Sequence, residues 1–398
     1  MIRRPAERDL RIDFFRGIAL IEIFVNHIPG NLFEKFSHKN FGITDAAEVF
    51  VLLAGVSAAF AYFPAFMNAS PFMAIGKVMK RVGTLYIAHL SNIVVGFALF
   101  SSFAVWFGTT FLLTEFNLPP MFAQTPAALV GLPLLTYQIG YFNILPIYVA
   151  LLSMLPAILF LAGVSRHLLL AVSVTLYLGA QIFQFNIPTF PDKGYWFFNP
   201  FAWQFIFTAG FLIGERVMRT GKGVPYYAPL FWASLAYLIA CGSYAYFNMW
   251  GTLPALPLPL TMVGNDKSYV SFPRLAHLLA LAYVIGHSPL MGWLKRWLTP
   301  QNMLVLIGRN SLPVFWTGTL LSVIGLQIRF IYNGYDAKTP MPEQPSIFWL
   351  DLILVLTGIL VQYGVAVLMD RLGRKQPARQ PAAASTSTLA ASPGTVAE

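Results

Sequence analysis

The sequence has one cysteine and few charged residues, and both shortages exclude classes of protein. With Cys241 alone, the chain forms no internal disulfide and holds no cysteine metal cluster. Charged residues make up 11% of the 398 residues, whereas a soluble domain has about a quarter, and hydrophobic residues make up 57%. Apolar runs long enough to cross a bilayer recur from one end to the other. The composition therefore predicts a polytopic membrane protein.

Several catalytic and binding motifs are also missing. The sequence contains no Gly-rich phosphate loop, no HExxH, no GxSxG elbow and no set of metal ligands at recognisable spacing. We therefore expect no metal and no bound cofactor. The net charge of +10 comes mostly from short segments between apolar runs, so we expect a lipid bilayer and no nucleic acid as a partner. Acid–base or transfer chemistry inside the membrane remains, as does transport.

The apolar runs predict an all-α fold. They lie near residues 14–30, 44–64, 84–107, 126–139, 144–163, 167–185, 201–215, 227–247, 274–292, 303–328 and 346–369. Lysine and arginine gather in alternate connecting segments, which predicts that both termini are cytoplasmic. Termini on one side require an even number of spans, so the short run 126–139 is predicted to be partial or re-entrant. About ten transmembrane helices remain.

The chain divides into two parts by composition. Residues 1–375 carry all the apolar runs and are predicted to form one integral-membrane domain. Residues 376–398 are low-complexity Pro, Ala, Ser and Thr sequence, which predicts a disordered tail.

Polar residues interrupt the first apolar run, where hydrocarbon disfavours them. Arg16 and His27 are eleven residues apart, which places them on one helix face, about 16 Å apart along the axis. Asp45 and Glu48 open the next run and are neighbours on one face of its helix. Because a short loop joins the two runs, we expect a carboxylate beside His27, which would orient the imidazole as a general base. The alternative is a polar cluster that only fixes helix packing.

Basic residues open the third long run. Lys77, Lys80 and Arg81 are explained by topology alone or, together with Arg16, by a phosphate clamp for a cytoplasmic donor that carries a nucleotide. His89 lies two turns further along and is predicted to face the same cavity.

Polar and aromatic residues in later segments are further candidates for the lining of a cavity. Trp196, Asn199, Trp203 and Gln204 belong either to an interfacial aromatic belt or to a platform for a sugar ring. The other candidates are Asp266, Lys267, Arg274, His277, Arg309, Asn310 and Ser311.

Several long stretches resemble OpgC-type proteins, which are relatives of the acyltransferase 3 superfamily. These stretches are RDLRIDFFRGIALIEIFVNHIPGN, NFGITDAAEVFVLLAG, NILPIYVALLSMLP, WFFNPFAWQ, DKSYVSFPRLAHLLALAY and GRNSLPVFW. The resemblance covers nearly the whole chain except the tail. Glu22 departs from the pattern, in which an apolar residue is expected.

The resemblance implies a membrane-bound O-acyltransferase of the bacterial inner membrane. Its implied substrates are acyl-CoA, with succinyl-CoA as the expected donor, and hydroxyls of osmoregulated periplasmic glucans. His27 matches the histidine that deprotonates the acceptor, and Arg16 matches the arginine that helps to hold the donor. Asp45 and Glu48 match an acidic pair of the OpgC-type signature, and Asn143 opens a matching stretch and is expected to line the cavity.

Three questions stay open at this point. The acyl group is not fixed, because Lys267, Arg274 or Arg309 alone could bind one extra carboxylate. The acceptor is a periplasmic glucan or, with acetyl as the group transferred, another surface polysaccharide. A transporter of an anionic solute or a glycan would also bury polar groups in its spans.

Overall fold

The computed structural model describes residues 7–252, 256–333 and 345–374. These residues form helices and loops with no strand, apart from an isolated bridge between Pro188 and Tyr195. The predicted all-α class is confirmed. The predicted tail lies outside the described residues.

Ten helices have 16 residues or more. They are α1 (Leu10–Asn26), α2 (Ala46–Asn68), α3 (Pro71–Phe107), α7 (Ile144–Val164), α8 (Arg166–Phe183), α9 (Pro200–Thr220), α10 (Ala228–Tyr246), α12 (Phe272–His287), α15 (Ser311–Asn333) and α16 (Phe348–Arg374). The shorter ones are η1 (Leu32–Phe36), η2 (His38–Asn40), α4 (Phe111–Glu115), α5 (Pro119–Ala123), α6 (Thr125–Gly131), α11 (Leu260–Val263), α13 (Pro289–Trp297) and α14 (Met303–Arg309).

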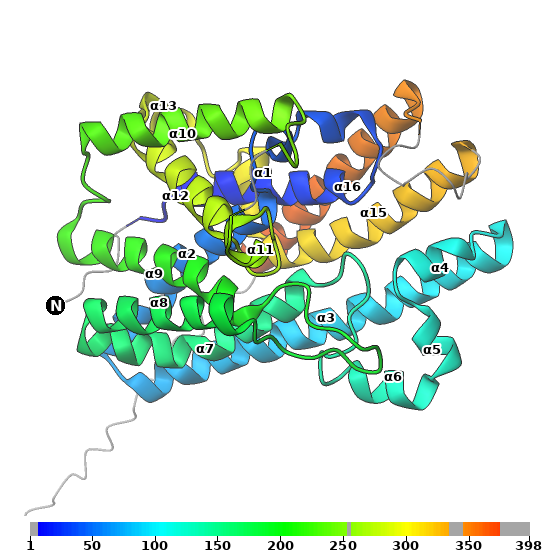
Figure 1. Ribbon diagram of the computed structural model, residues 1–398, viewed down its shortest axis with the longest axis horizontal. Coiled ribbons are helices and arrows are strands. Elements are labelled where there is room, and N and C mark those ends of the chain that lie inside the picture. Colours follow the sequence, from blue (N-terminus) through cyan, green and yellow to red (C-terminus); the bar gives the residue numbers. More distant parts are fainter. Residues whose placement is uncertain (1–6, 253–255, 334–344, 375–398) are drawn as a thin grey trace, which may run out of the picture.

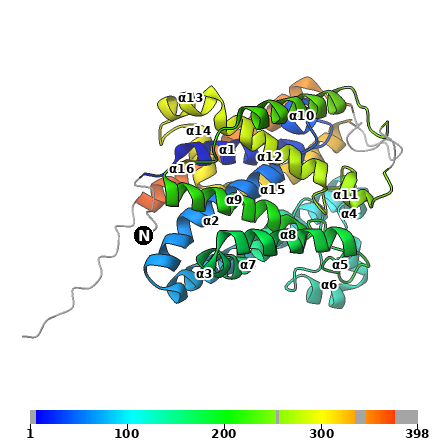
Figure 2. The same cartoon turned by 60° about the vertical axis from the view of Figure 1, so that its left-hand side comes forward.

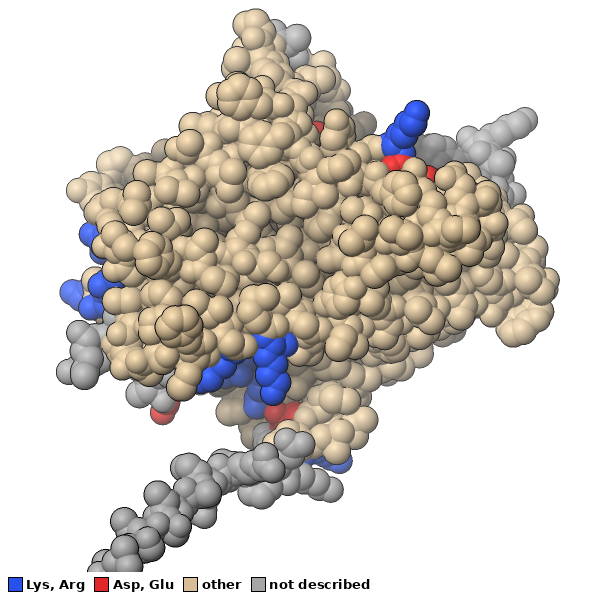
Figure 3. Space-filling model, turned by 90° about the horizontal axis from the view of Figure 1, so that it is seen from below, with Lys and Arg blue, Asp and Glu red and all other residues tan. Residues whose placement is uncertain are grey.

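The long helices form a bundle with two distinct ends (Figures 1 and 2). In Figure 1, α4, α5 and α6 gather at the right. We call the end where α1 begins the Arg16 end and the opposite one the His27 end. Figure 3 shows a broad surface nearly free of charged side chains, with lysine and arginine gathered mainly at its left and lower edges. Such a surface is what a bilayer requires.

Seven helices are long and apolar enough to span a membrane, or eight if α12 and α13, bent by 63° at their junction, count as one span. The prediction of about ten spans is not confirmed. The difference involves α1 and α9, which are not among these helices. Both carry charged residues and pack between other helices, α1 against α2, α14 and α15, and α9 against α2, α7 and α8. The predicted partial segment 126–139 contains only the short α6 and part of the loop that follows it.

Glycines allow the central helices to touch backbone to backbone. A Cβ added to Gly308 of α14 would lie 1.8 Å from the carbonyl oxygen of Asp13, and one added to Gly17 of α1 would lie 2.1 Å from that of Leu304. Small residues at helix crossings are a general device of membrane bundles. This crossing fixes α1, and therefore Arg16, against α14.

Gly308→Ala should consequently destabilise the protein by about 1–3 kcal/mol or more, because neither backbone can move away from the added methyl group. Thermal unfolding in detergent would measure the change. Gly286→Ala in α12 is the matched control, since nothing lies within 4 Å of its added Cβ. Equal stability of the two variants would contradict this account of the crossing.

Candidate active site

Arg16 lies beside a large cavity at the Arg16 end. Its guanidinium is buried and donates to the Ser57 hydroxyl on α2 and, at 3.5 Å, to Asp13. The cavity has a volume of 940 Å³, within the usual range for small-molecule sites. Its basic lining residues are Arg8, Arg11, Arg16 and Lys295, and its acidic ones are Glu7, Asp9 and Asp13. Anionic groups entering here would meet cations from the N-terminal segment, from α1 and from α13.

His27 lies directly after α1, at the opposite end of that helix. Its ring stacks on Tyr141, with the ring centroids 4.2 Å apart and the planes inclined by 12°. Nδ1 is buried and has no hydrogen-bond partner among the described residues. The spacing in the sequence correctly predicts an arginine and a histidine at opposite ends of one helix.

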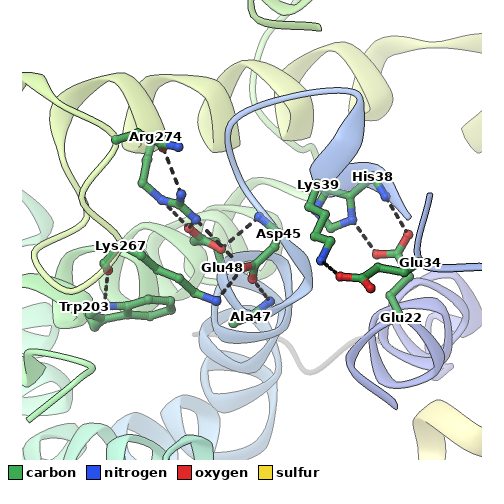
Figure 4. A network of polar contacts seen from close by, with 11 residues as sticks. Glu22, Glu34, His38, Lys39, Asp45, Ala47, Glu48, Trp203, Lys267 and Arg274 are labelled. Atoms are coloured by element: carbon green, nitrogen blue, oxygen red, sulfur yellow. Dashed lines mark hydrogen bonds and ion pairs between the residues drawn. The ribbon is translucent and has the colours of Figure 1, made fainter. Parts of the chain in front are cut away.

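Asp45 and Glu48 cap the start of α2. The Asp45 carboxylate accepts from the backbone N–H of Ala47 at 2.9 Å, and Glu48 accepts from the backbone N–H of Asp45 at 3.1 Å. Two cations complete the cluster (Figure 4): Arg274 of α12 donates to Glu48 through Nε at 2.8 Å, and Lys267 pairs with Asp45. Glu48 is fully buried, so Arg274 balances a charge that water cannot reach.

The role of Asp45 or Glu48 in orienting His27 stays a prediction. Neither Asp45 nor Glu48 hydrogen-bonds to His27; both are held by the capping box and by the cations of α12 and the loop before it. The sequence places these cations more than 200 residues away, so a local reading could not assign them to the acidic pair.

A carboxylate–histidine pair does form, on residues that the sequence analysis did not select. Glu22 of α1 accepts from the backbone N–H of His38 at 3.1 Å and pairs with Nδ1 of the same residue (Figure 4). Nε2 of His38 is buried and has no hydrogen-bond partner in the described part of the chain. The signal in the sequence was Glu22 itself, a carboxylate inside an apolar run.

This pair should make stability depend on pH. Burial lowers the pKa of His38, but the hydrogen bond and charge of Glu22, aided by Asp45 and Glu48, raise it by more, so the pKa lies above its usual value. A raised folded-state pKa stabilises the fold fully below the unfolded value of about 6.5, and this stabilisation is lost as pH rises through the folded value. His38→Gln should therefore lower the melting temperature more at pH 5.5 than at pH 9. An equal loss at both values would show that His38 is not charged in the fold.

Comparison with known proteins decides the family. The family model of the OpgC protein matches residues 8–374, which is nearly the whole chain. The chain belongs to the OpgC family. No curated protein and no solved structure matches it. Membership of the OpgC family indicates an acyltransferase-type function on glucans.

In this OpgC-family chain, the basic residues of α3 lie apart from the large cavity. Lys77 and Lys80 are exposed, and neither they nor Arg81 line it. Arg81 instead borders a second, 10 Å³ cavity with Tyr148 and Ser311. Of the four residues predicted to form a phosphate clamp, only Arg16 lines the large cavity, and its other basic lining residues are Arg8, Arg11 and Lys295. Lys295 could not be predicted from the sequence, because the bend between α12 and α13 brings it there.

The predicted sugar platform is not formed by the four residues proposed for it. Trp203 is fully buried, and its indole N–H donates to the backbone oxygen of Lys267 at 3.1 Å. Asn199 caps α9, and Gln204 accepts from the Ser173 hydroxyl at 2.6 Å. Trp196 is only 5% exposed. These side chains fix the start of α9 and have no open face for a sugar.

The remaining predicted residues are distributed over both ends of the bundle. Near the His27 end, Asp266 accepts from the backbone N–H of Tyr269 at 2.7 Å, and Nδ1 of His277 bonds the Thr44 hydroxyl at 2.7 Å. Arg309 pairs with Asp370 at 3.0 Å, and Asn310 donates to the carbonyls of Leu306 and Ala366. His89 and Asn143 differ from these, because each has a buried polar atom with no partner among the described residues.

Proposed function

We propose that this protein transfers an acyl group, with succinyl as the expected group, from cytoplasmic acyl-CoA to hydroxyls of periplasmic glucans across the bacterial inner membrane. One observation carries the proposal. A single helix, α1, borders at one end a 940 Å³ cavity lined by four basic and three acidic residues, and leads at the other to His27, whose buried Nδ1 has no hydrogen-bond partner among the described residues. Transfer between two compartments requires a donor site that opens to one side of the membrane and a base that an acceptor can reach from the other.

The cavity suits the nucleotide part of the donor. Lys295 is exposed and open to phosphates, whereas Arg8 and Arg11 pair with Asp13 and Asp9 at 2.6 Å and would exchange these partners for phosphate. Arg16 is buried. Arginine binds phosphate through two parallel hydrogen bonds, and lysine adds a point charge. In this proposal the Arg16 end faces the cytoplasm, which agrees with the basic N-terminus.

His27 would act as the general base. As the glucan hydroxyl oxygen attacks the thioester carbonyl, the imidazole removes its proton, and no cationic oxygen has to form. The tetrahedral intermediate then collapses and the carbon–sulfur bond breaks. The CoA thiolate takes the proton from the His27 imidazolium. The ester and free CoA are the products. Tyr141 holds the imidazole ring by stacking rather than by a hydrogen bond to the ring.

A transfer assay with purified protein tests the proposal. The full-length protein in detergent would be mixed with osmoregulated glucan and either radiolabelled succinyl-CoA or radiolabelled acetyl-CoA, and label on the glucan would be measured after separation. We expect label that increases with protein and is released by mild alkali, as an ester requires. Transfer of acetyl alone would favour the acetylating alternative. Absence of any transfer, together with glucan movement across proteoliposomes, would instead show a transporter.

A further inference from the structure

Two adjacent buried residues of α3 have no hydrogen-bond partners. His89 is 2% exposed and Asn92 is 1% exposed, yet both ring nitrogens and both amide atoms are unpaired among the described residues. Buried polar side chains almost always have a partner, and each unpaired group destabilises the fold. Four such atoms within one helical turn indicate that something absent from the protein alone bonds them.

These two residues belong to a stripe on α3 that runs from Arg81 to Gly96. Arg81, Leu85, His89, Asn92 and Gly96 follow one another at intervals of three or four residues, which places them on one face of α3. The helix packs against α2, α7 and α15. At the start of the stripe, Arg81 and Leu85 border the 10 Å³ cavity.

The upper part of the stripe reaches the surroundings of His27. A Cβ on Gly96 would lie 2.6 Å from the ring of Phe142. In the sequence, Phe142 follows Tyr141, which stacks on His27. With a rise of 1.5 Å per residue, His89 lies about 12 Å along α3 from Arg81 and about 10.5 Å from Gly96. It is therefore about midway between these two positions.

The donors among these unpaired atoms suit an anionic oxygen ligand, whereas the Asn92 side-chain oxygen can only accept. An imidazole carries at least one N–H, and a carboxamide carries two. Hydrogen bonds from such donors to a carboxylate are stronger than those between neutral groups, and they gain further strength away from water. An uncharged acetyl group would leave most of these donors unpaired.

We propose that the N–H groups of His89 and Asn92 bind the terminal carboxylate of a dicarboxylic acyl group and so select it over uncharged acyl groups. The inference rests on the proposed function and assigns the selectivity of that reaction to α3. The 10 Å³ cavity is lined by Leu85, one turn before His89, and holds about one water molecule. Leu85 must therefore move for the acyl group to enter.

The test compares two donors in two variants. Asn92→Leu keeps the side-chain size and removes the donors, and Ser91→Ala is the matched control, since Ser91 bonds Trp316 of α15 at 3.0 Å and is exposed. Asn92→Leu should lower succinyl transfer about 10-fold to 100-fold relative to acetyl transfer, because a bond to a charged group is lost. His89→Phe should act in the same direction. Ser91→Ala should leave the ratio unchanged.

The inference is overturned if Asn92→Leu leaves the ratio of succinyl to acetyl transfer unchanged. If both rates fall equally, the role of Asn92 is structural. If neither rate falls, water pairs these groups. Binding is read separately through the melting temperature with each donor. Succinyl-CoA should raise it more than acetyl-CoA, and Asn92→Leu should remove the difference. If the unaltered protein transfers nothing, the proposed function fails, and this binding difference alone then supports or refutes the carboxylate site.

Discussion

Replacing His27 with alanine should lower acyl transfer about 10²-fold to 10⁴-fold, the usual contribution of a general base. The structure gives this residue little part in folding. Its ring makes no hydrogen bond among the described residues and contacts Tyr141 through a stack of the kind that contributes about 0.5–1.5 kcal/mol. The variant should accumulate in membranes and melt close to the unaltered protein. Initial rates at saturating donor and acceptor measure the effect, which should fall on kcat.

His38 provides the comparison that makes this prediction sharp. It is the histidine that Glu22 orients, as a carboxylate orients the base in many enzymes. Under our proposal, His38→Gln changes stability and its pH dependence but lowers transfer less than tenfold. If His38→Gln removes transfer and His27→Ala does not, the base is His38 and the assignment of His27 is wrong.

Replacing Arg274 with methionine should destabilise the protein by about 3–5 kcal/mol and remove most of it from membranes. Glu48 would then be a fully buried carboxylate without its cation. The loss extends further, because Arg274 also donates to Asn265 at 2.9 Å and ties the loop before α12 to α2. Membrane abundance and thermal unfolding would measure the effect.

Two variants separate the buried pair from its surroundings. Lys267→Met breaks the partly exposed pair with Asp45 and should cost only about 1 kcal/mol or less. Adding Glu48→Leu to Arg274→Met removes both buried charges and should restore much of the lost stability. Should the double variant be no more stable than Arg274→Met alone, the unpaired carboxylate is not what destabilises it.

The sequence was sufficient for the helical class and for the polar contents of the first helix. Arg16 and His27 were found because helical periodicity is local and ionisable residues in apolar runs are rare. The number of spans could not be predicted in this way. Hydropathy treats every apolar run as facing lipid, whereas α1 and α9 are packed among other helices and carry charges.

The partners of the polar residues could not be predicted. Glu48 meets Arg274 across 226 positions, and Lys295 reaches the large cavity only because of the bend after α12. Aromatic residues suggested a binding surface where the structure has a buried contact. Trp203 looks like a binding surface in a Pro-rich loop, but its position at the start of α9 buries it. Long-range packing decided each of these cases.

Under the proposed function, the protein transfers an acyl group from a donor on one side of the membrane to an acceptor on the other. Proteoliposomes with labelled succinyl-CoA enclosed and glucan only outside test this directly, with His27→Ala alongside at equal protein content. We predict labelled glucan outside, no leakage of CoA, and little label with the variant. Label that appears only when both substrates share one compartment would contradict the account, as would passage of unlabelled glucan through the membrane without transfer.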